Sequence, residues 1–80
     1  MLIPAELRNV LSQNPKVMSG AICFAGTRIP VQILLDNHRA GVSLAEFLDA
    51  YPDLTHEQVQ AVMDWEDRQA RVLLGLVPAN

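Results

Sequence analysis

Five side chains have types and spacing that suit contact with DNA: Lys16, Arg28, His56, Gln58 and Gln60. A Gln side chain can form two hydrogen bonds with an adenine edge, and Lys or Arg can neutralise a phosphate. In this interpretation His56, Gln58 and Gln60 face the bases from the start of a helix, while Lys16 and Arg28 contact phosphates. That helix start itself contains no Lys or Arg, and the net charge of −3 argues against strong non-specific DNA affinity.

A second set of residues, farther along the same segment, suits contact with another protein. Trp65, Arg68, Arg71 and Leu73 combine an aromatic ring, two guanidinium groups and an aliphatic side chain. Aromatic and arginine side chains commonly carry the binding energy of interfaces. Packing of Trp65 against the N-terminal segment of the same chain explains the tryptophan equally well. Both interpretations can hold if the C-terminal segment packs across a dimer.

The sequence offers no set of residues that indicates catalysis or metal binding. Cys23 is the only cysteine, so neither an intramolecular disulfide nor a cysteine-ligated zinc site can form. A small buried thiol in a strand is the simpler interpretation. Neither His38 nor His56 has acidic neighbours at the spacing of metal ligands, and His38 is expected in the core or at its edge. We therefore expect no enzyme, no catalytic residue, no metal and no cofactor.

Three helices between residues 30 and 74 must position these side chains. The first begins near Pro30, which suits the first turn of a helix, and it ends at Gly41. Both later helices begin with a capping box, and the pairs are Ser43 with Glu46 and Thr55 with Gln58. Three helices with a tight turn between the last two match helix-turn-helix geometry, although a plain three-helix bundle uses the same packing.

The N-terminal part is expected to contain a helical segment and a hairpin. Apolar residues at helical spacing between Ile3 and Leu11 predict a short amphipathic helix within residues 1–14. Two β-prone runs, 16–18 and 21–25, predict a β-hairpin over residues 16–29 that ends in a turn at Gly26. Residues 30–74 then form the helix-turn-helix unit and residues 75–80 a tail. We expect one domain over residues 1–80, mainly α, with a three-helix homeodomain-like or winged helix-turn-helix bundle and a short N-terminal β-hairpin.

The composition favours a small protein that buries apolar surface against a partner. Half of the residues are hydrophobic, but only four are aromatic, and a chain this short buries a smaller fraction of its surface than a longer one. Self-association or binding of another protein would cover the remainder. The single cysteine fits a reducing, cytoplasmic setting. No apolar stretch approaches the roughly 18 residues needed to span a membrane, and we expect no signal peptide.

The central part of the sequence resembles a small prokaryotic family known as Domain of Unknown Function 433. The resemblance rests on the run Met-Ser-Gly-Ala-Ile-Cys-Phe-Ala-Gly-Thr-Arg-Ile-Pro-Val from Met18 to Val31. It continues through Ala40-Gly41-Val42-Ser43, Tyr51-Pro52-Asp53-Leu54-Thr55 and Val59, and covers roughly Pro15 to Trp65. Where the family often has Gly-Gly-Lys-Pro, this chain has Ser19-Gly20-Ala21-Ile22, so a basic residue is missing.

The resemblance implies a homeodomain-like or winged helix-turn-helix fold that is often dimeric. It also implies a role as antitoxin in a type II toxin–antitoxin pair, with a PIN-type ribonuclease as the toxin and the operator DNA as a further partner. The acidic third helix and the missing basic residue weaken the operator-binding part of this inference. The toxin-binding part does not depend on those residues.

Three hypotheses follow from these observations. In the first, the chain is a dimeric antitoxin that neutralises a cognate ribonuclease through arginines such as Arg28, Arg68 and Arg71 and through Trp65 and Leu73, and it represses its own promoter weakly. In the second, it is a sequence-specific DNA-binding regulator without a toxin. In the third, it is a dimerisation module with neither activity.

Overall fold

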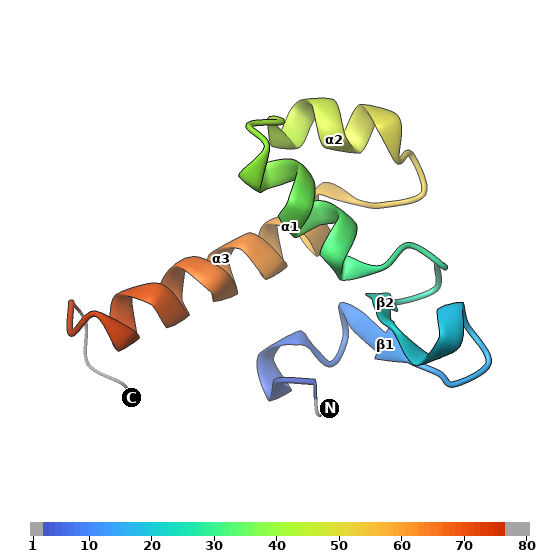
Figure 1. Cartoon of the computed structure of the whole chain (residues 1–80), viewed down its shortest axis with the longest axis horizontal. Coiled ribbons are helices and arrows are strands. Elements are labelled where there is room, and N and C mark those ends of the chain that lie inside the picture. Colours follow the sequence, from blue (N-terminus) through green and yellow to red (C-terminus); the bar gives the residue numbers. More distant parts are fainter. Residues whose placement is uncertain (1–2, 77–80) are drawn as a thin grey trace.

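The computed structural model describes residues 3–76 as a mainly helical chain with a short antiparallel hairpin near its N-terminus (Figure 1). The three α-helices are α1 (Val31–Arg39), α2 (Leu44–Ala50) and α3 (His56–Leu73). They are preceded by the 3-10 turn η1 (Ala5–Leu7), strand β1 (Leu11–Gln13), the 3-10 turn η2 (Met18–Gly20) and strand β2 (Ile22–Phe24). The prediction of three helices behind an N-terminal hairpin is therefore confirmed.

Both predicted capping boxes are present at the starts of α2 and α3. The Ser43 hydroxyl accepts a hydrogen bond from the Glu46 backbone N–H at 3.2 Å, and the Thr55 hydroxyl accepts one from the Gln58 N–H at 3.1 Å. Each N3 side chain in turn accepts from the backbone N–H of its cap. Because these bonds satisfy N–H groups that have no partner within the helix, they fix where each helix begins.

The end of α3 is closed by the backbone rather than by a side chain. The Leu76 N–H donates to the Arg71 carbonyl at 2.8 Å, and the Gly75 N–H donates to the Val72 carbonyl at 3.0 Å. Gly75 has φ +74°, the left-handed conformation that this pair of bonds requires and that glycine adopts at little cost. The sequence therefore stops α3 at Leu73, close to the predicted end at Leu74.

The hydrophobic core lies where the hairpin meets the three helices. Phe24 from β2, Leu34 from α1, Phe47 from α2 and Val59 from α3 are each almost fully buried and belong to one cluster. The rings of Phe47 and Tyr51 lie 4.8 Å apart in a tilted arrangement. Strand β2 and the helices α1, α2 and α3 thus each contribute one apolar side chain to a single core.

The hairpin uses a different first strand from the predicted one, and residues 3–14 do not form the predicted helix. Within the described part, η1 spans one short turn, and β1 then pairs with β2 so that Leu11 lies opposite Phe24. The run 16–18 cannot act as a strand because Asn14, Pro15 and Lys16 form a turn, in which the Asn14 side chain accepts from the Lys16 N–H at 2.9 Å. Met18 also has φ +49°, outside the extended region. Burial of Leu11 against Phe24 overrides the helical spacing of the N-terminal apolar residues.

The turn between β2 and α1 follows the prediction. Gly26 has φ +78°, and the Thr27 hydroxyl donates to the Phe24 carbonyl at 2.9 Å and accepts from the Ile29 N–H at 3.1 Å. The Phe24 N–H closes the same turn on the Ile29 carbonyl at 3.0 Å. The Gly-Thr pair is therefore a structural turn that leads the chain from β2 into α1.

The second half of α3 extends away from α1 and α2 (Figure 1). The radius of gyration is 13.2 Å, above the value of about 11.5 Å that a compact chain of this length has. The main neighbour of α3 outside the helical core is η1. The radius of gyration exceeds the compact value because the other described residues leave the end of α3 largely uncovered. Within residues 3–76, no helix combines the length and the apolarity that crossing a membrane requires.

Candidate functional site

Of the three residues predicted to face DNA bases, Gln58 is the one most firmly engaged within the protein. The Gln58 side chain accepts from the Thr55 N–H at 3.0 Å and donates to the Ala25 carbonyl at 3.3 Å, so both of its polar ends are engaged within the protein. Gln60 donates to the Asp64 carboxylate at 2.9 Å. His56 is exposed at the start of α3. The structure therefore gives Gln58 a structural role, while Gln60 is held by one exposed bond and His56 is exposed.

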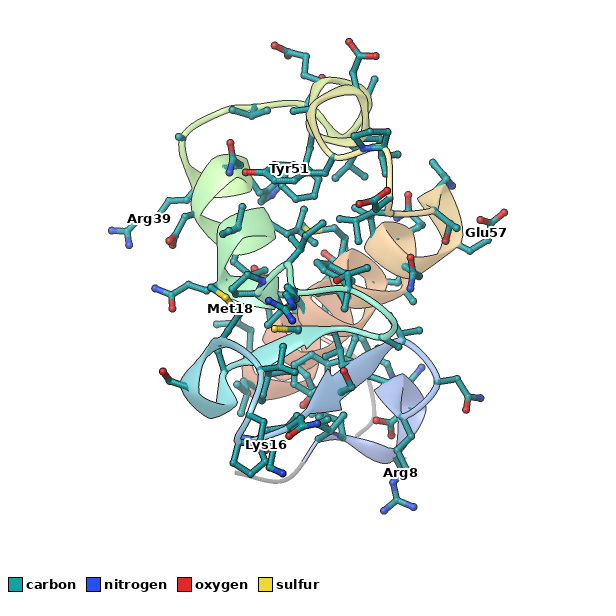
Figure 2. The ribbon with its side chains drawn as sticks, turned by 90° about the vertical axis from the view of Figure 1, so that its right-hand side faces the viewer. Arg8, Lys16, Met18, Arg39, Tyr51 and Glu57 are labelled. Atoms are coloured by element: carbon teal, nitrogen blue, oxygen red, sulfur yellow. The ribbon has the colours of Figure 1, made fainter. Side chains whose placement is uncertain are left out.

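Of the two predicted phosphate contacts, Lys16 lies in the hairpin turn, whereas Arg28 shares a hollow with Asp53 in the turn that precedes α3. Lys16 is exposed in the hairpin turn at the lower left of Figure 2, whereas Glu57 in the first turn of α3 lies at the right of that view. Arg28 is exposed beyond β2 and lines an open hollow with Asp53 and Asn14. A carboxylate that shares a hollow with the only charged donor lowers its attraction for phosphate.

The surface of the three-helix part is acidic. Between Val31 and Trp65 there are six carboxylates and a single arginine, Arg39. All six carboxylates are exposed, and they lie on each helix and on the turn between α2 and α3: Asp36, Glu46, Asp49, Asp53, Glu57 and Asp64. Because most non-specific DNA affinity comes from cations that replace counterions, this surface repels a phosphate backbone.

The exposed end of α3 carries the other predicted site residues. Arg68 and Arg71 are both exposed, and Arg71 forms an ion pair with Asp67 at 2.8 Å. Leu73 and Leu74 expose 83% and 73% of their surface, which is high for leucine at the end of an ordered helix. The spacing of an α-helix places Arg68 and Arg71 on one side and Leu73 on the other, while Leu74 lies near Arg71. The structure thus brings apolar and cationic groups together on a projecting segment.

Trp65 is engaged within the chain. Its ring is half-buried against the core, and its indole N–H donates to the Glu6 carboxylate at 3.2 Å. The contact joins residues that are 59 positions apart in the sequence, so Trp65 ties the N-terminal segment to α3. Of the two interpretations of Trp65, the intramolecular one is confirmed.

An apolar groove of about 370 Å³ lies beside Trp65, and sequence reasoning did not predict it. Its walls include Leu11 from β1, Val31 and Leu35 from α1, and Val62 from α3, with the Glu66 side chain as the charged group among its lining residues. The N-terminal leucines carry the signal for this groove, but their spacing predicts a helix. In the structure Leu11 lies in a strand, and the N-terminal leucines face the apolar sides of α1 and α3.

The two remaining candidates for chemistry have ordinary environments. His38 is exposed near the end of α1, so its predicted place in the core is wrong. Cys23 is 1% exposed, which confirms the expected buried thiol in a strand. Across residues 3–76, no group of three or more His, Cys, Asp or Glu side chains is arranged to hold a metal ion.

The comparison with protein families agrees with this architecture. A family model described as a protein of unknown function, DUF433, matches residues 11–65. The chain belongs to the DUF433 family. The match begins at β1 and ends at Trp65, so it includes the hairpin, α1, α2 and the first half of α3. The exposed end of α3 from Glu66 onward lies outside the matched part.

Two relatives support the family membership. The crystal structure of a DUF433 member protein from Anabaena variabilis has a TM-score of 0.66 and 28% sequence identity, and the match covers 86% of this chain and 79% of that one. The protein y4eO of Sinorhizobium fredii, named as uncharacterized, is 30% identical over 56 residues. That match covers 70% of this chain but only 25% of the relative, so the chain spans about a quarter of the length of y4eO.

Proposed function

We propose that this DUF433 protein is an antitoxin-like protein-binding module, and that the exposed end of α3 binds a cognate ribonuclease of the PIN type. The observation that carries the proposal is the projecting helix end, which combines Arg68 and Arg71 with the largely exposed Leu74. Apolar and arginine side chains on a rigid helix are suited to a protein groove. The nature of the partner rests on the family resemblance.

The chemistry of such a partner fits the two arginines. A nuclease that holds its metal with clustered carboxylates presents a strongly negative site, and a guanidinium group pairs with carboxylates through two parallel hydrogen bonds. Arg68 makes no ion pair within the described residues, and the exposed Arg71–Asp67 pair is of the kind that contributes only a few tenths of a kcal/mol. Both side chains can therefore reach a partner at little cost. Trp65, which is engaged with Glu6, is the less suitable anchor.

Operator binding is the second proposal, and the arrangement of α2 and α3 supports it. The short turn between these helices and the exposed His56 at the start of α3 are compatible with a helix-turn-helix. The engaged Gln58 and the six carboxylates oppose it. Binding of an upstream DNA fragment that weakens steeply as salt is raised would support this proposal, and binding that does not respond to salt would count against it.

The experiment for the first proposal uses the product of the neighbouring reading frame. That protein is purified and its Mg²⁺-dependent cleavage of a fluorescent RNA is followed while the chain is titrated in. We expect the wild-type chain to suppress cleavage at a stoichiometric amount. The double variant Arg68→Ala/Arg71→Ala should require at least ten times more protein, because two interface arginines commonly contribute more than the 1.4 kcal/mol that a tenfold change represents.

The matched control is Arg8→Ala/Arg39→Ala. These two arginines are exposed and project from the hairpin end and from α1 (Figure 2), so the control removes the same charge from other surfaces. It should inhibit like the wild type. Equal loss in both double variants would mean that net charge rather than the α3 end governs binding. No inhibition by the wild-type chain would overturn the proposed function.

A further inference from the structure

The apolar groove and the exposed Leu73 lie on the same side of α3. Val62, Glu66, Gln69 and Leu73 are separated by four, three and four residues, which places them on one face of a helix. Val62 and Glu66 line the groove, whereas Leu73 projects beyond it with 83% of its surface exposed. One helix face thus carries an apolar hollow in its middle and an apolar side chain at its end.

We propose that this face binds a second copy of the chain through an antiparallel pairing of the two α3 helices. The twofold axis would pass beside Gln69, which is three residues after Glu66 and four before Leu73. In that register Leu73 of each copy enters the groove of the other near Glu66. The contact is reciprocal, as in an isologous dimer.

Three observations favour a second copy as the occupant. Both halves of the contact are on this chain, and Leu73 is seven residues from Glu66, about 10 Å along the helix, so the two contacts form together. The chain is larger than a compact one of its length because α3 projects, and pairing would cover that end. Gln69, which lies between the groove and Leu73 on this face, would meet its own copy, and a central polar residue of this kind sets the register of paired helices.

The pairing is independent of the proposed function. Leu73 lies on the opposite side of α3 from Arg68 and Arg71, so the arginines remain accessible when two helices are paired. The dimer is also measured on the protein alone, whereas toxin inhibition requires the second protein. Failure of one proposal therefore leaves the other open to its own test.

The first test compares two substitutions at adjacent exposed leucines. Leu73→Glu introduces a carboxylate on the proposed face, and Leu74→Glu introduces the same group about a quarter of a turn away. Sedimentation velocity over a wide concentration range should give a dimer for the wild type and for Leu74→Glu, and a monomer for Leu73→Glu. Far-UV circular dichroism checks that the helices are retained. A monomeric wild type, or equal effects of the two substitutions, would overturn the proposal.

The second test places a thiol on the proposed axis and does not depend on dissociating the dimer. Cys23 is buried, so a cysteine introduced on the surface is the reactive one. Gln69→Cys should form a disulfide-linked dimer on mild oxidation, because residues on the axis of two packed helices come within disulfide distance. Asp67→Cys, two residues away and facing outward, should react at least ten times more slowly. Equal rates for the two variants would contradict the register.

Discussion

Replacing Gln58 by Ala should destabilise the protein, because this side chain holds two parts of the structure together. Its carbonyl oxygen accepts from the Thr55 N–H at 3.0 Å, which completes the capping box of α3. Its amide group donates to the Ala25 carbonyl at 3.3 Å, which ties the turn before α1 to the start of α3. The residue that the sequence assigned to an adenine is thus a structural link between segments 33 positions apart.

The size of the effect follows from the two bonds. A capping interaction and a partly buried hydrogen bond each contribute about 1 kcal/mol, and the better helix propensity of Ala offsets a few tenths. We expect Gln58→Ala to lower the free energy of unfolding by about 1.5–2 kcal/mol. In a domain of this size that corresponds to a loss of roughly 10 °C in Tm. Urea unfolding followed by circular dichroism measures both the midpoint and the slope.

Two further variants separate the bonds. Gln58→Glu keeps the oxygen that accepts from Thr55 but replaces the donor to Ala25 with a second acceptor, so it should lower the free energy of unfolding by about 1 kcal/mol or more through the Ala25 contact alone. Gln60→Ala removes one exposed bond to Asp64 and should change stability by less than about 0.5 kcal/mol. If Gln58→Ala is as stable as Gln60→Ala, the structural role is wrong and Gln58 is again available for recognition.

Three other perturbations test the fold. Phe47→Ala should lower the free energy of unfolding by about 3–5 kcal/mol in urea, because its ring is 1% exposed, and an unchanged midpoint would contradict the core. Gly26→Ala should lower the free energy of unfolding by about 1–2 kcal/mol through its φ of +78° alone, since no described atom beyond its two chain neighbours lies within 4 Å of the added methyl group, and a more stable variant in thermal melts would show that this turn is wrong. Trp65→Phe should lower the free energy of unfolding by less than about 1 kcal/mol, because it loses one exposed bond to Glu6. Trp65→Ala should lower it by about 3 kcal/mol in the same melts. Equal losses for the two variants would mean that the ring does not pack on the core.

The helical part of the fold could be predicted because its signals are local. The Ser43 and Thr55 caps, each with its partner three residues later, mark the starts of α2 and α3 by short-range hydrogen bonds. Gly75 marks the end of α3 in the same way. The hairpin was less predictable because β1 is chosen by a long-range contact. Leu11 is a strand residue since it is buried against Phe24, and nothing in its immediate sequence shows that.

The candidate site was predictable in its residue types but not in its geometry. The exposure of Arg68 and Leu73 follows from the projection of α3, which depends on how much of the helix the hairpin and η1 can cover. The engagement of Gln58 by Ala25 also depends on the tertiary arrangement. The groove required both the strand position of Leu11 and the helix face of Val62, and these come from separate parts of the chain.

We expect the exposed end of α3, rather than its first turn, to contact the protein partner. Titration of a ¹⁵N-labelled chain with the product of the neighbouring reading frame, followed through the backbone amide shifts by NMR, tests this most directly. We expect the largest changes at Arg68, Arg71 and Leu74, and little change at His56 and Gln60. The largest changes at His56 and Gln60, with none beyond Glu66, would contradict the account.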